Sequence, residues 1–250
     1  MPKISPVPEF CQTGFPPPVI ATSVTGMMTD LLSKLLPHPA TSARQILLAM
    51  SVLLGLAYLG DGFGLSLPYP ANVVLKASGI ILLGVIAAQY RCGWLAAGLW
   101  LGAAGDAFLA LQPARFDLGI LAFGLGHLVY IGLFAHHLRR SGLNGRTGVL
   151  AAIGLGVFGL VMLIWLQPHF GELRIAASIY NAIILVMAIL AVLGRSHPLA
   201  ITGALLFVVS DSVLATRQFA GLLEWAGPVV WSTYYLAQAG IALGLTRKAD

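Results

Sequence analysis

Long apolar runs separated by short stretches rich in proline, glycine or charged residues dominate the chain. A helix needs about 20 apolar residues to cross the hydrocarbon core of a membrane. Eight runs come close to that length: residues 44–60, 72–90, 93–112, 117–138, 147–167, 173–193, 198–216 and 223–246. The pattern therefore predicts an all-α membrane protein, with a bundle of eight transmembrane helices forming one domain over residues 44–246.

Proline and glycine mark the predicted helix boundaries. Pro198 fits the first turn of the seventh helix, where no backbone hydrogen-bond donor is needed. Pro228 falls in the opening turns of the eighth helix, where it can bend the helix. Residues 91–93 must make the whole turn between the second and third helices, which makes this boundary the weakest one.

The composition supports the membrane class. Of the 250 residues, 58% are hydrophobic and 9% are charged, whereas soluble domains carry roughly 25% charged residues. Cys11 and Cys92 lie far apart and form no disulfide framework or cysteine-rich metal motif, so we expect no metal or cofactor. The net charge of +5 is spread over short loops, which indicates membrane topology rather than a nucleic-acid partner.

Residues 1–43 differ from the rest of the chain because they contain many prolines, including a run at 16–18, and no long apolar run. Prolines and a glutamate within the first nine residues interrupt the apolar core that a signal peptide needs. We expect a poorly ordered, Pro-rich cytoplasmic N-terminal tail, in which residues 29–36 could form one or two amphipathic turns on the membrane surface. Translation from Met27 or Met28 is the alternative.

Lysine and arginine are unevenly divided between the two predicted sides of the membrane. Eight helices put both termini on one side, which carries ten basic residues: Lys3, Lys34, Arg44, Arg91, Arg139, Arg140, Arg146, Arg195, Arg247 and Lys248. The other side carries three: Arg115, Arg174 and Arg217. Basic loops stay in the cytoplasm, so both termini are predicted to be cytoplasmic. The expected location is a bacterial inner (plasma) membrane.

A weak internal repeat fits the eight-helix count. Asp106 in the third helix and Asp211 in the seventh have similar neighbours and lie 105 residues apart, as do Tyr130 and Tyr235 in the fourth and eighth helices. Four helices separate the copies, so matching helices run in the same direction. A parallel 4+4 repeat about an axis along the membrane normal has this property. Chance similarity of short segments is the alternative.

The same two aspartates are the most informative residues. A charged group at the centre of a bilayer costs about 2.5–3.5 kcal/mol on insertion scales, so carboxyl groups there must be shielded, hydrated or neutral. This makes Asp106 and Asp211 the first candidates for a functional site. A structural ion pair with Lys76 is the alternative, but one lysine cannot neutralise two carboxylates, so at least one must be protonated or hydrated.

Together with the aspartates, polar residues of six helices are predicted to lie between the outer third and the middle of the membrane. Lipid offers them no hydrogen-bond partners, so we expect one shared, partly hydrated cavity. The candidate site residues are Lys76, Asp106, His127, Tyr130, Tyr180, Asn181, Ser210, Asp211, Tyr234 and Gln238.

Each supporting residue also has a structural interpretation. Lys76 could extend to the outer interface, and His127 could be a packed, hydrogen-bonded histidine. The tyrosines could be packing residues with satisfied hydroxyls, and Gln238 could join helices. The serines could bond back to their own helix, which we favour for Ser212. Three glycines of the third helix are expected to permit close helix packing rather than ligand approach: Gly98, Gly102 and Gly105.

Several short motifs follow one another along the chain. No single motif is decisive, but the ordered set is specific enough to suggest a protein family. The motifs are Asn72-Val-Val-Leu-Lys76, Gly105-Asp106 with Phe108-Leu109, Phe116-Asp-Leu-Gly-Ile-Leu-Ala-Phe-Gly-Leu-Gly-His127-Leu-Val-Tyr130, Tyr180, Gly203-Ala-Leu-Leu-Phe-Val-Val-Ser-Asp211-Ser and Tyr234-Tyr-Leu-Ala-Gln238. Over residues 50–245 the set resembles the YhhN family of integral membrane proteins, whose animal members are lysoplasmalogenases. The family often has Lys-Pro where this chain has Lys76-Ala77, which affects the expected local helix geometry.

The resemblance implies an eight-helix fold and a hydrolase that cleaves the vinyl ether bond of lysoplasmalogens. The products would be a fatty aldehyde and glycerophospho-ethanolamine or glycerophosphocholine. The implied partners are a membrane lipid substrate, a lysophospholipid, and water. In that family two intramembrane aspartates are held to be catalytic, and they match Asp106 and Asp211.

The chemistry suits two carboxyl groups. An acid protonates the β-carbon of a vinyl ether, water adds to the resulting oxocarbenium ion, and the hemiacetal collapses to aldehyde and alcohol. One neutral carboxyl group would donate the proton, and the other, as carboxylate, would stabilise the cation and accept a proton from water, as in glycosidases. Lys76 and His127 are hypothesised to hold the phosphate or steer the proton, with tyrosines positioning the head group. Which aspartate is the acid stays open.

Two other function classes stay open. Intramembrane carboxyl groups and repeats also occur in transporters, so a proton-coupled transporter or lipid-binding protein is the main alternative. A hydrolase of a different lipid ether or ester is the second, although no Gly-x-Ser-x-Gly motif points to a serine esterase. Product formation, and access to the cavity from one side or both, distinguish these classes.

Overall fold

The computed structural model describes residues 26–27, 30–36, 41–64 and 67–247, so most of the predicted N-terminal tail lies outside the described residues. Within these ranges the chain is helical, without β-strands, which confirms the all-α class. The long helices are α2 (Ser42–Leu59), α3 (Ala71–Gln89), α4 (Gly93–Ala110), α5 (Phe116–Ser141), α6 (Gly145–Leu166), α7 (Arg174–Leu193), α8 (Pro198–Ala220) and α9 (Gly227–Leu245). Short 3₁₀ turns join several of them: η1 (Gly60–Phe63), η2 (Gln167–His169), η3 (Gly171–Leu173) and η4 (Glu224–Ala226).

Seven of the described helices, α2 to α8, are long and apolar enough to cross a membrane. The protein is therefore a multi-pass integral membrane protein. The outer surface agrees, because α6 exposes a row of apolar side chains at helical spacing that water would not favour: Leu150, Ile153, Val157, Val161 and Ile164. Helix α9 is not among the seven. It carries Trp231, Tyr234, Tyr235 and Gln238, which lower its hydropathy but are buried inside the bundle.

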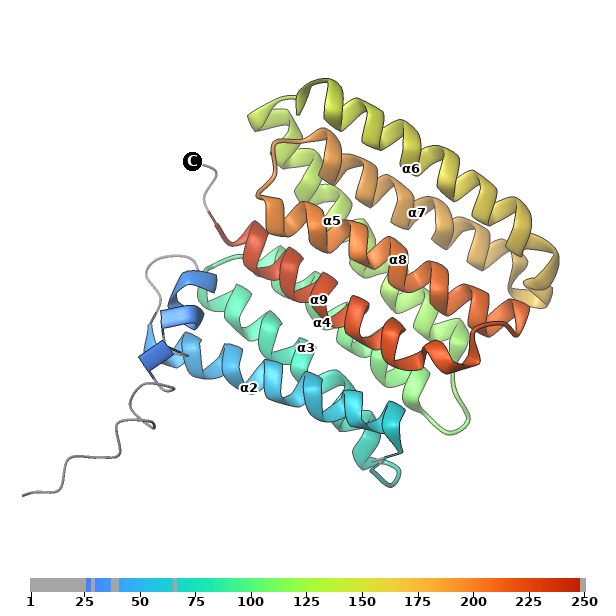
Figure 1. The fold of residues 1–250 in the computed structure, drawn as a ribbon, viewed down its shortest axis with the longest axis horizontal. Helices are drawn as coiled ribbons and strands as arrows, with labels where there is room; N and C mark the ends of the chain where they lie inside the picture. Colours follow the sequence, from blue (N-terminus) through green and yellow to red (C-terminus); the bar gives the residue numbers. More distant parts are fainter. Residues whose placement is uncertain (1–25, 28–29, 37–40, 65–66, 248–250) are drawn as a thin grey trace, which may run out of the picture.

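The helices run side by side with consecutive ones alternating in direction (Figure 1). Helices α2, α3 and α4 pack in sequence, and α5 packs on both α4 and α7, so α6 lies outside α7. Helix α9 packs along α8 and also touches α2, α3 and α4. The last helix therefore connects α8 to the group formed by α2, α3 and α4 at the centre of the bundle.

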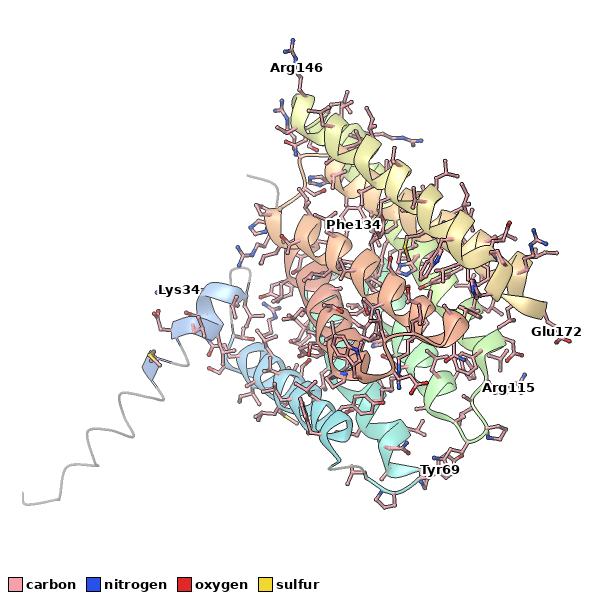
Figure 2. The ribbon with its side chains drawn as sticks, turned by 45° about the vertical axis from the view of Figure 1, so that its right-hand side comes forward. Lys34, Tyr69, Arg115, Phe134, Arg146 and Glu172 are labelled. Atoms are coloured by element: carbon pink, nitrogen blue, oxygen red, sulfur yellow. The ribbon has the colours of Figure 1, made fainter. Side chains whose placement is uncertain are left out.

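The two ends of the bundle are formed by alternate connections. The α2–α3, α4–α5, α6–α7 and α8–α9 connections lie at one end, hereafter the α8–α9 end, and the beginning of α2 and the end of α9 lie at the other (Figure 1). Figure 2 shows Arg115 and Glu172 at the α8–α9 end, Arg146 at the opposite end and Phe134 between the helices. Phe134 is fully buried.

Glycines set the close approach of α8 and α9. A methyl group on Gly203 would lie 2.7 Å from the carbonyl oxygen of Ala237, and one on Gly240 would lie 2.7 Å from that of Leu199. Small residues at such positions are a common device for packing membrane helices, because they let the backbones meet. The tight α8–α9 contact fixes the position of Asp211 relative to the residues of α9.

The glycines of α4 play the packing role predicted for them. A methyl group on Gly98 would lie 2.6 Å from the ring of Tyr130, and one on Gly105 would lie 2.6 Å from the ring of Phe123, both on α5. A side chain at Gly102 would meet the amide group of Gln238 on α9. The prediction of close helix packing is confirmed, and α4 is held between α5 and α9.

Two predicted boundaries in the C-terminal third need correction. The last helix begins at Gly227 rather than at 223, so Pro228 lies in its first turn and does not bend it. Helix α8 begins at Pro198 as predicted, but continues past 216 to Ala220 and ends at Gly221, whose φ of 64° is the left-handed conformation typical of helix ends. Four additional residues, 217–220, therefore belong to α8.

The described part of the predicted tail contacts the bundle. Residues 30–35 are helical, and the side chain of Leu36 is buried in the main apolar core. Arg247 Nη2, just beyond α9, donates hydrogen bonds to the carbonyl oxygens of Lys34 (2.8 Å) and Leu35 (3.1 Å). Residues 30–36 therefore dock on the end of the bundle that carries the beginning of α2.

Candidate active site

A cavity of about 390 Å³ lies in the bundle, lined by residues of α2 to α9. Most of its wall is apolar and aromatic, including Phe123, Phe158, Met162, Leu185 and Trp231. Among its polar lining residues are Lys76, Asp106, Tyr180, Asn181, Ser210, Asp211 and Tyr234. Seven of the ten candidate residues thus line one cavity.

Asp106 ends a buried chain of hydrogen bonds that crosses three helices. The Tyr130 hydroxyl on α5 donates to Gln238 Oε1 on α9 at 2.7 Å. Gln238 Nε2 donates to the Tyr234 hydroxyl oxygen at 3.2 Å, and the Tyr234 hydroxyl donates to Asp106 Oδ2 on α4 at 2.6 Å. Asp106 is 2% exposed, so this chain determines the direction in which one of its oxygens points.

Asp211 on α8 has a separate set of partners. Tyr180 on α7 donates its hydroxyl proton to Asp211 Oδ2, and His127 Nε2 on α5 lies 3.1 Å from the same hydroxyl oxygen. Because the Tyr180 proton goes to Asp211, His127 Nε2 must be the donor to Tyr180. His127 Nδ1 is buried with no hydrogen-bond partner among the described residues, which fits an unprotonated Nδ1.

Lys76 places a cation in the lining of the same cavity. It lies in the second turn of α3, is half-buried and lines the cavity. Its ammonium group lies 5.7 Å from the ring centroid of Tyr58. Both Lys76 and Asp211 interact electrostatically with Asp106. The lysine is therefore part of the cavity lining.

Two other polar candidates, Asn181 and Ser210, use their side chains to join helices. Asn181 Nδ2 donates a 3.4 Å hydrogen bond to the carbonyl oxygen of Gly159 on α6. Ser210 donates at 2.9 Å to the carbonyl oxygen of Val230, which joins α8 to α9. Ser212 donates at 2.7 Å to the carbonyl oxygen of Val208 in its own helix, as predicted.

Three of the predicted site residues do not line the cavity: His127, Tyr130 and Gln238. Each is at most 1% exposed and lies behind a tyrosine that does line it, His127 behind Tyr180 and the other two behind Tyr234. His127 therefore meets the cavity through Tyr180, and its hypothesised role in holding a phosphate or steering a proton stays a prediction. These three residues form their hydrogen bonds in the interior of the bundle, away from the cavity.

Arg217 lines the cavity and was missed as a site residue by the sequence argument. The sequence placed it in a loop because the seventh helix was predicted to end at 216. In the structure Arg217 lies in the last turn of α8. Gly221 was the sequence signal for the true end of α8, since helices often end at a glycine, and it would have placed Arg217 inside the helix. Within the described residues no group of three His, Cys, Asp or Glu side chains could hold a metal ion.

Comparison with known proteins identifies the family. Residues 71–245, from α3 to the end of α9, match the sequence model of the YhhN family. The chain belongs to the YhhN family. Both aspartates and Lys76 lie within the matched residues, whereas Tyr58 and Leu59 at the end of α2 line the cavity from outside them.

Curated relatives of this YhhN protein carry a common name. Lysoplasmalogenase TMEM86A of Bos taurus is 35% identical over 164 residues, which cover 61% of this chain and 65% of the relative. Lysoplasmalogenase TMEM86B of Rattus norvegicus is 36% identical over 171 residues, covering 68% and 69%. Lysoplasmalogenase TMEM86A of Homo sapiens is 30% identical over 204 residues, covering 74% and 82%.

The chain thus spans about two thirds of the length of the bovine and rat relatives. No solved structure matches the chain.

Proposed function

We propose that the protein is a lysoplasmalogenase, which hydrolyses the vinyl ether bond of lysoplasmalogens inside the membrane. One observation carries the proposal: two carboxyl groups, Asp106 on α4 and Asp211 on α8, line one largely apolar cavity and each accepts a hydrogen bond from a tyrosine. An apolar wall suits a long hydrocarbon chain, and two carboxyl groups suit acid–base chemistry. The names of the curated relatives support the same activity.

In the proposed reaction a carboxylic acid protonates the β-carbon of the vinyl ether, and the positive charge spreads over the α-carbon and the ether oxygen. Water then adds to the α-carbon while a carboxylate accepts one of its protons. The hemiacetal then loses the glycerol oxygen as an alcohol: the carboxyl group that took a proton from water protonates this oxygen, and the carboxylate left by the first step accepts the hemiacetal hydroxyl proton. The products are a fatty aldehyde and glycerophospho-ethanolamine or glycerophosphocholine, and both carboxyl groups return to their starting forms.

We assign the acid to Asp211 and the carboxylate to Asp106. A cation beside a carboxyl group stabilises its ionised form, and Lys76 acts electrostatically on Asp106. In a low-dielectric cavity two neighbouring carboxyl groups tend to share a single negative charge. Asp106 would then stabilise the oxocarbenium ion, while Asp211 would donate the proton. Tyr180 and Tyr234 would hold the reacting oxygens in position.

The proposed orientation follows from α9 and the basic loops. With 19 residues α9 is about 28 Å long at 1.5 Å per residue, which is close to the thickness of a bilayer core. Its polar side chains are bonded within the bundle, so we infer that α9 is an eighth span. Both termini then lie on the more basic, cytoplasmic side, and the α8–α9 end faces outward. A bacterial inner membrane is the proposed location.

The position of the cavity favours a hydrolase over a transporter. Most of its lining residues come from the half of each helix near the α8–α9 end, and the innermost lie just past the middle, such as Leu185 on α7 and Val208 on α8. Alternating access would require a path from this cavity to the opposite end. A lipid that enters from one leaflet needs only the cavity in that half.

The experiment measures aldehyde release from a lysoplasmalogen by the purified protein in detergent. Asp106→Asn and Asp211→Asn should each lower turnover by about 10²-fold or more, the usual contribution of a general acid or base. Tyr235→Phe is the matched control, because its hydroxyl pairs with Ser51 and does not line the cavity. Near-normal turnover in both asparagine variants would refute the mechanism. A wild-type protein inert on vinyl ether, diacyl and lyso-ester lipids would instead favour a transporter or lipid-binding protein.

A further inference from the structure

Arg217 is an exposed cation in the lining of the cavity. It lies six residues after Asp211 on the same helix, so the two backbones are separated by about 9 Å along the helix axis at 1.5 Å per residue. Its guanidinium group lies beside the first residue of α9, since a methyl group on Gly227 would be 3.5 Å from Nη1. Arg217 therefore lies between the carboxyl groups and the α8–α9 end.

The other arginines at this end differ from Arg217 in their partners. Arg115 forms a bidentate pair with Asp117 at 2.8 and 3.0 Å, and Arg174 Nη2 donates to Gln167 Oε1 at 3.1 Å. Neither arginine lines the cavity. Across the described part of the chain, no carboxylate or carbonyl group forms an ion pair or hydrogen bond with Arg217. Its guanidinium group is therefore available to bind an anion from outside the chain.

We propose that Arg217 binds the phosphate of the lysophospholipid head group and thereby sets which bond reaches Asp106 and Asp211; this assignment rests on the proposed function. A planar guanidinium group binds a phosphate through two parallel hydrogen bonds. In a lysoplasmalogen six bonds separate the vinyl α-carbon from the phosphorus, about 7 Å at the advance per bond of an extended chain. That length is comparable to the rise of about 9 Å along the helix axis between the backbones of Asp211 and Arg217.

The charges in the cavity also favour this orientation. Asp106, the assigned carboxylate, lies in the inner part of the cavity and is the group on which Lys76 acts, whereas no carboxylate of the described residues pairs with Arg217. With the phosphate at Arg217, the head group points to the α8–α9 end and the alkenyl chain lies against the apolar wall formed by Phe158, Met162 and Leu185. A substrate in this orientation carries its anionic charge away from the carboxyl groups that act on the vinyl ether.

The first test is binding, because it does not depend on turnover. Two non-hydrolysable ligands with the same chain, a 1-alkyl lysophosphocholine and the matching 1-alkylglycerol, are titrated into the purified protein in detergent. Arg217→Ala should weaken binding of the phosphate-bearing ligand by about 10-fold and leave binding of the alkylglycerol unchanged. Arg217→Lys should recover part of the loss, since it restores the charge without the planar fork. Arg174→Ala, an arginine at the same end but outside the cavity lining, should match the wild type.

Kinetics on a lysoplasmalogen and on the phosphate-free 1-alkenylglycerol provide the second readout. Arg217→Ala should raise KM for the phospholipid about 10-fold with a smaller change in kcat, and should not change KM for the alkenylglycerol. Equal effects on the two ligands, or no effect on either, would overturn the assignment. Phosphate-selective binding without aldehyde release by the wild type would retain the phosphate site and reject the proposed hydrolase.

Discussion

The Tyr234 hydroxyl donates a 2.6 Å hydrogen bond to Asp106 Oδ2 from a helix that lies 128 residues further along the chain. Asp211 has an equivalent donor in Tyr180, on the helix that precedes it. Each carboxyl group thus has one oxygen bound to a tyrosine of another helix. Catalytic groups that hydrogen bonds already hold in position need no reorganisation when a reaction begins, and this is what preorganised catalysis means.

Tyr234→Phe should lower kcat about 10-fold or more, because Asp106 loses the donor that orients it. Tyr235→Phe, at the next position of α9, removes a buried hydroxyl that forms a 2.7 Å hydrogen bond with Ser51 instead. It should cost about 1 kcal/mol of stability and leave kcat unchanged. Aldehyde release and thermal unfolding separate the two effects. Equal loss of activity in both variants would show that the role of Tyr234 is structural.

Gly102→Ala should lower turnover although residue 102 itself has no functional group. Its methyl group would meet Gln238 Nε2 and lie 3.4 Å from the Tyr234 hydroxyl oxygen, so it would displace the hydrogen bonds that lead to Asp106. Gly132→Ala on α5 is the control, since nothing lies within 4 Å of the added methyl group there. A Gly102→Ala protein with wild-type kcat would mean that the amide of Gln238 can move at no cost to Asp106.

His127→Phe should reduce kcat by about 3- to 10-fold and leave KM for the lipid unchanged. The histidine contacts Tyr180 at 3.1 Å and does not line the cavity, so we expect it to orient Asp211 through Tyr180 rather than to hold the substrate. Steady-state kinetics on a lysoplasmalogen give the answer. An increase in KM with constant kcat would instead restore His127 as a binding residue.

Lys76→Met should lower kcat strongly, by about 10²-fold, because the charge that acts on Asp106 is lost. Lys76→Arg should retain a larger share of the activity if the charge, rather than the shape of the ammonium group, is what matters. Both variants are compared by aldehyde release after the folded state has been checked by size-exclusion chromatography. Equal activities of the Lys76→Met variant and the wild type would exclude an electrostatic role for Lys76.

Cysteine labelling in intact bacterial cells tests the proposed orientation. In a background of Cys11→Ser and Cys92→Ser, a cysteine replacing Leu222 in the α8–α9 connection, where the side chain is 51% exposed, should react with a membrane-impermeant thiol reagent. A cysteine replacing Arg146, at the opposite end (Figure 2), should react only after the membrane is permeabilised. The reverse labelling pattern would show that the protein has the opposite orientation, with the cavity on the cytoplasmic side of the membrane.

Local pattern was sufficient for much of the fold and for the identity of the candidate carboxyl groups. The apolar runs predicted each of the long described helices because length and hydropathy are properties of neighbouring residues. Asp106 and Asp211 stood out because a carboxyl group is costly inside an apolar segment. The parallel 4+4 repeat stays a prediction: Tyr130 and Tyr235, 105 residues apart, have different hydrogen-bond partners, Gln238 and Ser51.

Tertiary structure alone decided which polar groups meet. Sequence placed His127 and Tyr180 at similar depth, but only the packing of α5 on α7 brings them within 3.1 Å. It also separated the residues that line the cavity from those behind the tyrosines, and it brought Arg217 into the cavity wall. The physical reason is that an apolar pattern specifies how long a helix is and that one face is buried. It does not specify which helix covers that face, and hydrogen-bond partners depend on that choice.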